Sequence, residues 1–286
     1  MESIGEIPQC DRTTSDGRIY PSQRKPISIL NPTAREQKAI QNPAVVEKLV
    51  NGETSSPVNA HKLVMSEAKA ERKSAEYDLS EDDCLLFCAD IKSGLPEIPD
   101  NSVDFIITDP PYPKEYLTLY EDLSFLASRV LKDGGSLLCM CGQSYLNEVM
   151  TNLCFHMEYH WTLCYLTPGG QSPQLWAKST NTFWKPIIWL TKGKYKGDLI
   201  SDIVKTPPNE NDKTHHEWGQ SVAGFDELVK KFAYPGQTIL DPFLGGGTTA
   251  ICALKANCRF IGVDISQECI EKTKARLAET KGRESP

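Results

Sequence analysis

Apolar and polar positions alternate in two ways along the second part of this chain. From Asp83 onward, short apolar runs are separated by longer stretches in which apolar residues recur every three to four positions. The short runs are CLLFCAD, VDFIITD, GSLLCMC, HWTLCYLT, FWKPIIWLT, QTILD and RFIGVD, and the longer stretches are YLTLYEDLSFLASRVLK, QSYLNEVMTNLCF, SVAGFDELVKKFA, TTAICALKAN and QECIEKTKARLAE. Apolar strands that alternate with amphipathic helices are typical of a sheet covered on both faces. We therefore predict an α/β fold with a mostly parallel, seven-stranded sheet.

The N-terminal part of the chain has a different pattern. Residues 1–32 are rich in Pro, Ser, Thr and charge, which predicts an irregular arm. In residues 33–79, two segments are predicted to be helical, the first interrupted at Asn42-Pro43 and closed at Asn51-Gly52. The prediction is thus an irregular arm (1–32), a helical accessory region (33–79) and an α/β domain (80–286).

The segment ILDPFLGGGTTAICALKANCRFIGVD has the order expected of a cofactor site. The strand QTILD runs into three glycines at residues 245–247, and a helix opens at Thr248. Glycines allow a sharp turn and a close ligand, and a helix N-terminus offers free N–H groups to an anion. The next strand ends in Asp264, where doubly wound folds present an acid to ribose hydroxyls. The glycines do not follow the G-x-G-x-x-G spacing of dinucleotide sites. The alternative is a tight turn that binds no ligand. The full succession of strand, glycines, helix, strand and terminal acid favours a nucleoside cofactor.

A second motif, Asp109-Pro110-Pro111-Tyr112, directly follows the apolar run VDFIIT. Two consecutive prolines cannot continue a central strand, because neither donates a backbone hydrogen bond. They make a stiff loop whose carbonyl groups, together with the Asp109 carboxylate, accept hydrogen bonds. Such acceptors suit an exocyclic amino group, and Tyr112 supplies an aromatic face for a base taken out of its stack. The alternative is a loop that only ends the strand.

Charge and cysteine content exclude several classes of protein. The formal net charge of −7 argues against a protein that coats nucleic acid, so any such contact must be local. Six lysines between Lys178 and Lys205 are a candidate for that contact, although their spacing favours an ordinary solvated surface. The ten cysteines include no C-x-x-C pair, so we predict no metal site and a reducing cytoplasm. No leader and no long apolar run is present, so we expect no membrane partner.

Together the two motifs resemble those of AdoMet-dependent DNA amino-methyltransferases. The catalytic motif of that family matches Asp109-Pro110-Pro111-Tyr112, its AdoMet motif matches DPFLGGGT at residues 241–248, and the resemblance covers roughly residues 83–280. The catalytic motif precedes the AdoMet motif, as in the β class. The resemblance implies a Rossmann-like methyltransferase fold, S-adenosyl-L-methionine as cofactor, DNA as substrate with base flipping, and a restriction-modification setting. DPPY leans toward adenine N6, whereas SPPY is commoner in cytosine-N4 enzymes.

The resemblance also implies roles for individual residues. Asp241 and the loop after it would hold the methionine portion of AdoMet, Asp264 its ribose, and Asp90 would lie near its adenine. The segment HHEWGQS, with His216 and Trp218, stands where the family has a motif that contacts the cofactor carboxylate. The cofactor-binding residues implied are Asp90, Gln220, Ser221, Asp241, Phe243, Gly245, Gly247, Thr248 and Asp264.

The chemistry expected of the catalytic motif is mainly positioning. Hydrogen bonds from an adenine amino group to Asp109 and to the Pro110 carbonyl would favour a tetrahedral nitrogen and aim its lone pair at the sulfonium methyl. Orientation of this kind saves roughly 7 to 11 kcal/mol of barrier. No strong general base is required.

This chain departs from the family where the DNA target is read. A recognition domain usually lies between the last strand and the AdoMet motif, and here only YKGDLISDIVKTPPNENDKT remains. We expect DNA contacts from the loop of residues 168–184, with Trp176 filling a vacated stack; a flexible hairpin is the alternative. Residues 42–73 weakly resemble the helical tail after the helix-turn-helix of ParB-like proteins, which implies that residues 33–79 contribute to partner or DNA binding.

Several alternatives stay open at this level. In these alternatives, the chain is an enzyme that acts on cytosine N4, on RNA or on a protein amide, or it is a silent DNA-binding subunit. The intact DPPY and glycine motifs argue against the last of these. A homodimer or a separate specificity subunit is compatible with the sequence, and the recognition sequence is not encoded in any motif.

Overall fold

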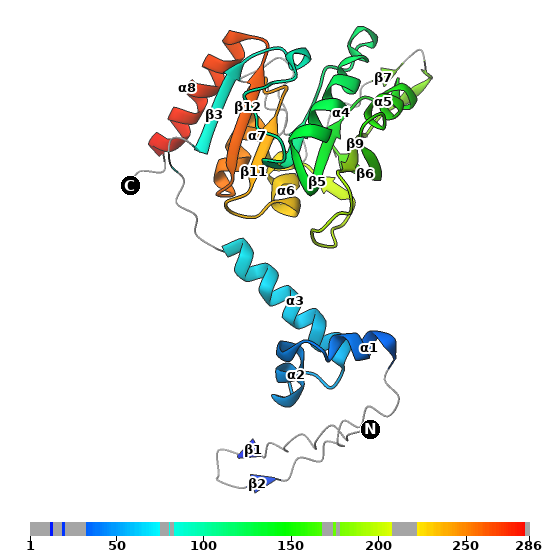
Figure 1. The fold of residues 1–286 in the computed structure, drawn as a ribbon, viewed down its shortest axis with the longest axis vertical. Coiled ribbons are helices and arrows are strands. Elements are labelled where there is room, and N and C mark those ends of the chain that lie inside the picture. The colour runs from blue at the N-terminus through cyan, green and yellow to red at the C-terminus, as the bar shows by residue number, and fades with distance from the viewer. Residues whose placement is uncertain are drawn as a thin grey trace. The chain divides into compact units, whose positions relative to one another are not determined.

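The computed structural model describes residues 12–13, 19–20, 33–74, 80, 83–167, 174–175, 178–207 and 222–283 (Figure 1). The chain separates into two compact units, Met1–Ala75 and Glu76–Pro286. None of the helices in the described residues is long and apolar enough to cross a bilayer.

The described part of the first unit contains three helices, and the first two have strong local start signals. Thr33 and Glu36 form a reciprocal capping box at the first helix, and the Asn42 side chain accepts a hydrogen bond from the Ala44 amide (3.0 Å) at the second. Gly52 follows the second helix with a φ of 70°. The elements are β1 (Arg12–Thr13), β2 (Ile19–Tyr20), α1 (Ala34–Ala39), α2 (Pro43–Val50) and α3 (Pro57–Ser74). Their small core consists of Ala39, Val45, Leu49 and Ala60.

The second unit is organised around an eight-stranded sheet in the order β10-β6-β9-β5-β4-β11-β12-β3. The strands are β3 (Cys84–Cys88), β4 (Val103–Thr108), β5 (Leu131–Met140), β6 (Glu158–Leu166), β9 (Trp184–Thr191), β10 (Ile203–Lys205), β11 (Thr238–Asp241) and β12 (Arg259–Asp264). Five neighbouring strands, from β5 to β3, are parallel, and β9 runs antiparallel to both β5 and β6. The predicted mostly parallel α/β sheet is confirmed.

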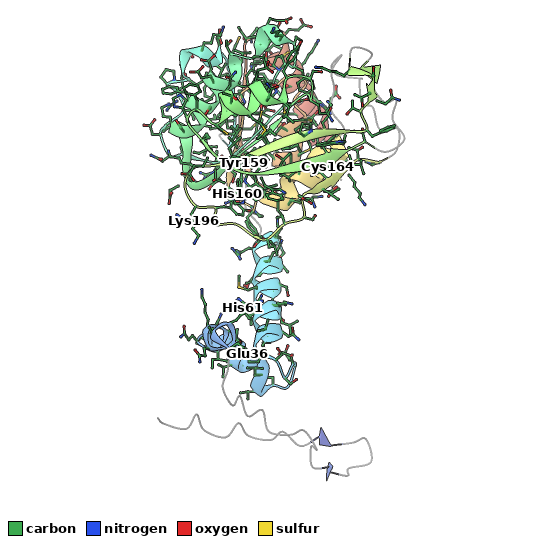
Figure 2. The ribbon with its side chains drawn as sticks, turned by 90° about the vertical axis from the view of Figure 1, so that its right-hand side faces the viewer. Glu36, His61, Tyr159, His160, Cys164 and Lys196 are labelled. Carbon is green, nitrogen blue, oxygen red and sulfur yellow. The ribbon has the colours of Figure 1, made fainter. Side chains whose placement is uncertain are left out.

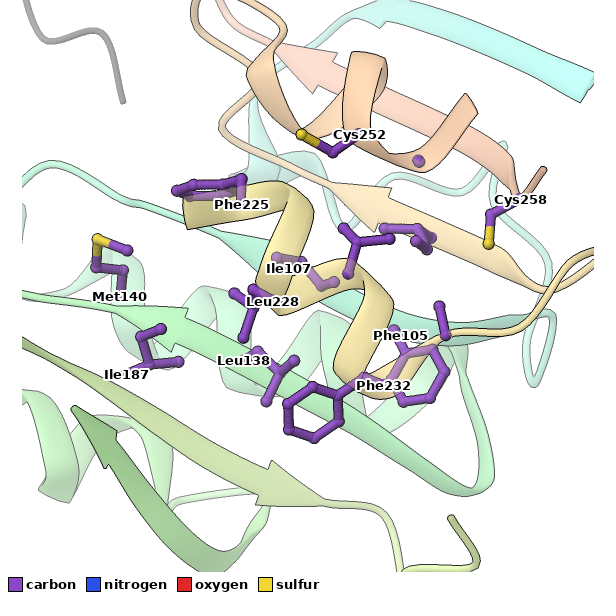
Figure 3. Close-up of a cluster of buried hydrophobic side chains, with 14 of the residues drawn as sticks. Phe105, Ile107, Leu138, Met140, Ile187, Phe225, Leu228, Phe232, Cys252 and Cys258 are labelled. Atoms are coloured by element: carbon purple, nitrogen blue, oxygen red, sulfur yellow. The ribbon is translucent and has the colours of Figure 1, made fainter. Parts of the chain in front are cut away.

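Helices cover both faces of this sheet. They are η2 (Ile91–Ser93), η3 (Lys114–Tyr116), α4 (Leu119–Val130), α5 (Leu146–Leu153), α6 (Val222–Phe232), α7 (Thr248–Lys255) and α8 (Gln267–Arg283). α4 and α5 contribute to one buried cluster, and α6, α7 and α8 to the other. Consecutive strand residues alternate between the two clusters, as Ile106 and Ile107 do. Figure 3 shows α6 on the second face, with Phe225, Leu228 and Phe232 against the strands.

The structure adds elements that the sequence pattern does not reveal. β10 joins the sheet as an eighth strand, parallel to β6, and β7 (Gln174–Leu175) pairs with β8 (Thr180–Asn181) as a two-residue ladder. β10 has only three residues, of which Val204 alone is buried, so no period of two can be seen in it. Figure 2 shows Tyr159, His160 and Cys164 along β6, the strand beside which β10 pairs.

Candidate active site

The candidate active site is the edge of the sheet at which the parallel strands end. Because β9 runs antiparallel to β5, its first residues share this edge with the last residues of the other strands. In the strand order β9, β5, β4, β11, β12 and β3, the edge carries Lys185, Gly142, Asp109, Asp241, Asp264 and Asp90. Neighbouring strands lie about 4.8 Å apart. The sheet thus brings the DPPY motif and the glycine motif, far apart in sequence, to adjacent strands.

The DPPY motif leaves β4 as a compact loop. Pro110 is buried, Pro111 is exposed, and the Pro111 carbonyl accepts a hydrogen bond from the Tyr120 hydroxyl at 3.3 Å. The Tyr112 hydroxyl donates a hydrogen bond to the carboxylate of Asp109. Burial, and to a lesser extent the Asp109 charge, raise the pKa of Tyr112 well above its usual value, so it remains a neutral donor.

The ring of Tyr112 has two neighbours that bear on its use as a stacking surface. A Cβ added at Gly142 would lie 3.3 Å from ring atoms of Tyr112, so a larger residue there would require the ring to shift by a few tenths of an ångström. The Lys185 ammonium lies 5.1 Å from the ring centroid, within cation–π range.

Asp241 connects the two motifs directly. Its carboxylate accepts hydrogen bonds from the Thr108 hydroxyl at 2.7 Å, from the Phe243 amide at 3.1 Å and from the Thr249 side chain. The Thr108 bond joins the end of β4 to the end of β11. Burial raises the pKa of Asp241 to about 6, although these hydrogen bonds oppose the shift.

Asp264 is held by two backbone amides. One carboxylate oxygen accepts a hydrogen bond from the Gly245 amide at 2.8 Å, and the other from the Ser266 amide at 2.9 Å. Each oxygen keeps a second acceptor position, because a carboxylate has about four. Asp264 therefore fixes the glycine loop and still has acceptors for ribose hydroxyls.

The glycine loop ends at the N-terminus of α7. Gly247 has a φ of 74°, and a Cβ added there would lie 2.6 Å from Thr273 of α8, so only glycine fits without movement. In the described structure the amides of Gly246, Thr248 and Thr249 have no backbone acceptor. These donors, with the positive end of the helix, match the carboxylate of an amino-acid cofactor. The residues present therefore fit AdoMet.

Arg276 of α8 supports this loop, although the sequence patterns do not point to it. Its guanidinium donates to the Gly246 carbonyl at 2.6 Å and to the Thr248 hydroxyl at 3.2 Å, and the side chain is largely buried. Thr273 of the same helix donates to the Gly245 carbonyl at 3.4 Å. α8 has an ordinary alternation of charged and apolar residues, so nothing in its sequence distinguishes these two polar side chains from solvated ones.

The remaining predicted residues fall into two groups. Asp90 lies on the same edge and caps η2, accepting a hydrogen bond from the Lys92 amide at 3.0 Å. The other group, outside the described residues, consists of Trp176, His216, Trp218, Gln220 and Ser221.

The six lysines between Lys178 and Lys205, whose spacing favours a solvated surface, do not act as one binding surface. Lys192 donates to Asn101 and Lys196 pairs with Asp133, both away from the candidate site. Lys185 alone of these three lies at the carboxyl edge. Within the described part of the chain, no group of three or more His, Cys, Asp or Glu side chains could hold a metal ion.

Sequence comparisons connect this geometry to known proteins. A family model described as DNA methylase (N6_N4_Mtase) matches residues 103–275, more than half of the chain. The type II methyltransferase M.HpaI of Haemophilus parainfluenzae is 27% identical over 240 residues, covering 67% of this chain and 73% of that protein. The DNA adenine methyltransferase YhdJ of Escherichia coli is 24% identical over 240 residues, covering 66% of this chain and 80% of that protein.

Solved structures share the fold. A complex of M1.HpyAVI with SAM superposes with a TM-score of 0.57 at 21% identity, covering 68% of this chain and 98% of the other. The PvuII cytosine-N4-specific DNA methyltransferase gives a TM-score of 0.59 at 14% identity, covering 68% and 88%. At this level of identity, the likeness concerns the fold.

Proposed function

This chain belongs to the DNA methylase family of N6-adenine and N4-cytosine methyltransferases, and we propose that it methylates the N6 amino group of adenine in DNA. The family takes its methyl group from AdoMet. The observation that carries the proposal is the adjacency of Asp109, directly after β4, and Asp241, the last residue of β11, with Thr108 of β4 bonded to Asp241 across the two strands.

The part of the edge that carries the DPPY loop, called the substrate half, would orient the amino group of the base. Adenine N6 donates its hydrogens to the Asp109 carboxylate and to the Pro110 carbonyl, which restricts the nitrogen to a geometry with a localised lone pair. The ring of Tyr112 would stack on the flipped base. The hydrogen bond from the Tyr120 hydroxyl to the Pro111 carbonyl fixes the position of the loop. When bound, AdoMet would supply an electrophilic methyl group carried on sulfur. As the nitrogen–methyl bond formed, the methyl–sulfur bond would break to leave a neutral thioether, and the nitrogen would release one proton past the Asp109 carboxylate to solvent.

The part of the edge that carries Asp241, the glycine loop and Asp264, called the cofactor half, would hold AdoMet within reach of that nitrogen. Asp241 is suited to the α-amino group, and the amides around Gly247 and Thr248 to the carboxylate. Asp264 is suited to the ribose and Asp90 to the adenine. Phe243 and Gly245 complete the loop; Gln220 and Ser221 remain proposed contacts by resemblance.

Adenine rather than cytosine is favoured by the first residue of the motif. With Asp109 the motif reads DPPY, the form that leans toward adenine N6, whereas SPPY is commoner in cytosine-N4 enzymes. The relative YhdJ is named as an adenine methyltransferase. The fold does not choose between the bases, since the PvuII cytosine-N4 enzyme shares it.

The parts outside the sheet core are proposed to serve DNA binding. We keep the division into an arm (1–32), an accessory region (33–79) and a catalytic domain (80–286), with the loop of residues 168–184 as the main DNA contact. A chain of residues 80–286 is expected to bind AdoMet as the full chain does and DNA more weakly. Equal DNA affinity would remove the accessory region from this proposal.

The decisive experiment identifies the modified base. The full chain is incubated with isotopically labelled AdoMet and a mixture of DNA and RNA, and the digested nucleosides are separated by mass spectrometry. Labelled N6-methyldeoxyadenosine is expected. Labelled N4-methyldeoxycytidine would overturn the choice of base, and label in RNA alone would overturn the choice of DNA. An Asp109→Ala preparation serves as the control for a contaminating methylase.

A further inference from the structure

Lys185 lies in the candidate active site but has no part in the reaction proposed above. It is the second residue of β9, and the register pairs Ile187 with Met140, the last residue of β5. Lys185 therefore extends past the end of β5, at the edge where the DPPY loop lies. It shares a face of β9 with Ile187, because side chains alternate along a strand.

The surroundings of the Lys185 ammonium are unusual for a partly buried lysine. The described residues include no carboxylate in ion-pair contact with it, and its neighbour is the Tyr112 ring, with the centroid at 5.1 Å. By contrast, Lys192 and Lys196 of the same basic stretch are bonded to Asn101 and Asp133. A cation held against an aromatic ring without an anion is able to exchange the ring for a phosphate.

The two neighbours of the Tyr112 ring differ in their freedom to move. Gly142 contacts the ring through backbone that follows directly from β5 and is anchored nearby by the bond from the Cys141 amide to the Pro186 carbonyl, at 3.1 Å. The Lys185 side chain has four rotatable bonds and leaves the ring without any backbone movement. A base that stacks on Tyr112 would thus take the place of the ammonium.

Charge indicates where the ammonium would go. The chain carries a formal charge of −7, and this edge carries Asp90, Asp109, Asp241 and Asp264. A polyanionic substrate therefore approaches an acidic edge, where a local cation counters the repulsion. A flipped nucleotide brings both a base for the ring and adjacent phosphates for the cation.

Building on the proposed function, we propose that Lys185 is a positioning residue for the flipped nucleotide. Its ammonium covers the Tyr112 ring in the free protein, gives way to the base, and then binds a backbone phosphate next to that nucleotide. Lys185 does not touch the reacting nitrogen or the methyl group. Its effect is on the binding of DNA in the flipped state.

The test compares Lys185→Met with Lys185→Arg in the full chain. Lys194→Met is the matched control, since Lys194 is exposed and lies past the other end of the β5–β9 pair. DNA affinity is measured by titration of a DNA duplex over a range of salt concentrations, and AdoMet affinity by calorimetry. The duplex carries the sequence found methylated in the base-identification experiment, or mixed genomic fragments if none is methylated.

Lys185→Met is expected to lower the magnitude of the slope of log affinity against log salt by about 0.9, the value for one lost phosphate contact on duplex DNA. AdoMet affinity should stay within about twofold of wild type, while Lys185→Arg and Lys194→Met keep the wild-type slope. With 2-aminopurine at the target adenine, Lys185→Met should show a smaller rise in fluorescence on binding, because fewer bases are flipped.

An unchanged slope and an unchanged fluorescence rise in Lys185→Met would overturn the inference. So would an equal loss of slope in Lys194→Met, which would mean that any lysine on the surface has the same effect. The salt slope is measured without turnover. An inactive wild type would therefore refute the proposed function while the role of Lys185 is still decided.

Discussion

The cofactor half and the substrate half of the same sheet edge are held in different ways. In the cofactor half, Asp241, Asp264 and Arg276 each bond to backbone groups of the glycine loop, at distances of 2.6 to 3.1 Å. In the substrate half, the functional side chains contact one another: Tyr112 donates to Asp109, and Lys185 covers the Tyr112 ring. The first half is locked by the main chain, whereas the second is closed by side chains.

This difference suggests when each half reaches its working geometry. Bonds to the main chain remain when the cofactor enters, so the cofactor half is preorganised and loses little entropy on binding. The contacts of Asp109 and Tyr112 must be exchanged for contacts with the base. The substrate half therefore opens only when DNA provides a replacement for each contact.

The sharpest division between the halves is expected from Asp109→Ala. This change removes the acceptor for the amino group, and the rate of methyl transfer should fall by roughly 10²- to 10³-fold, as for loss of a preorganised catalytic hydrogen bond. AdoMet affinity, measured by calorimetry, should remain within about threefold. Asp133→Ala, which removes an exposed carboxylate paired with Lys196, is the control and should retain activity. Near-normal turnover by Asp109→Ala would contradict the assignment of this motif.

Arg276→Met tests the cofactor half through a residue that is not itself a proposed contact of AdoMet. Loss of the bonds to Gly246 and Thr248 should cost about 1.5 to 3 kcal/mol, because they involve a charged donor. Both the melting temperature and AdoMet affinity should fall, the latter by roughly tenfold or more. Lys272→Met, on the same helix in an exposed pair with Glu268, should change neither. A stable variant with normal AdoMet affinity would show that the glycine loop does not need α8.

The pKa of Asp241, about 6, predicts how AdoMet affinity depends on pH. The positively charged amino group of AdoMet prefers the ionised carboxylate, which takes up a proton as the pH falls through about 6. Affinity should therefore weaken by roughly tenfold from pH 7 to pH 5. Calorimetry at both values is the measurement, and Asp241→Asn should flatten the profile. An equally steep profile in that variant would place the titrating group elsewhere.

The same shift has the opposite sign for the stability of the cofactor-free protein. The carboxyl loses its proton near 3.8 when unfolded and near 6 when folded. Between these values the folded state binds more protons, so the free energy of unfolding falls as the pH rises. The contribution of this group is on the order of 3 kcal/mol, seen as a difference between wild type and Asp241→Asn.

The smallest effect is expected from Tyr112→Phe. The ring for the base remains, and only the hydroxyl that occupies Asp109 in the free protein is lost. The rate should stay within about fivefold of wild type, whereas Tyr112→Ala should weaken DNA binding by the loss of a stacked base, about 1 to 3 kcal/mol. Single-turnover rates and DNA titrations measure the two effects. Equal losses in both variants would assign the role to the hydroxyl rather than to the ring.

Local patterns predicted the elements that carry the site. The runs ending at Asp109, Asp241 and Asp264 are strands, and the three glycines lead into a helix at Thr248. Such features depend on residues that are close in sequence, as strand periodicity, proline restriction and glycine turns do. β10 was missed because only Val204 among its three residues is buried.

By itself, the sequence determined the α/β class, the two motifs and their order, because each is written in a few consecutive residues. Only the tertiary structure decided which side chains meet. The bond from Thr108 to Asp241, the support of Gly246 by Arg276 and the contact of Lys185 with Tyr112 each join residues far apart in the chain. The physical reason is that strand order and register arise from packing the whole sheet between its helices, and no local pattern specifies them.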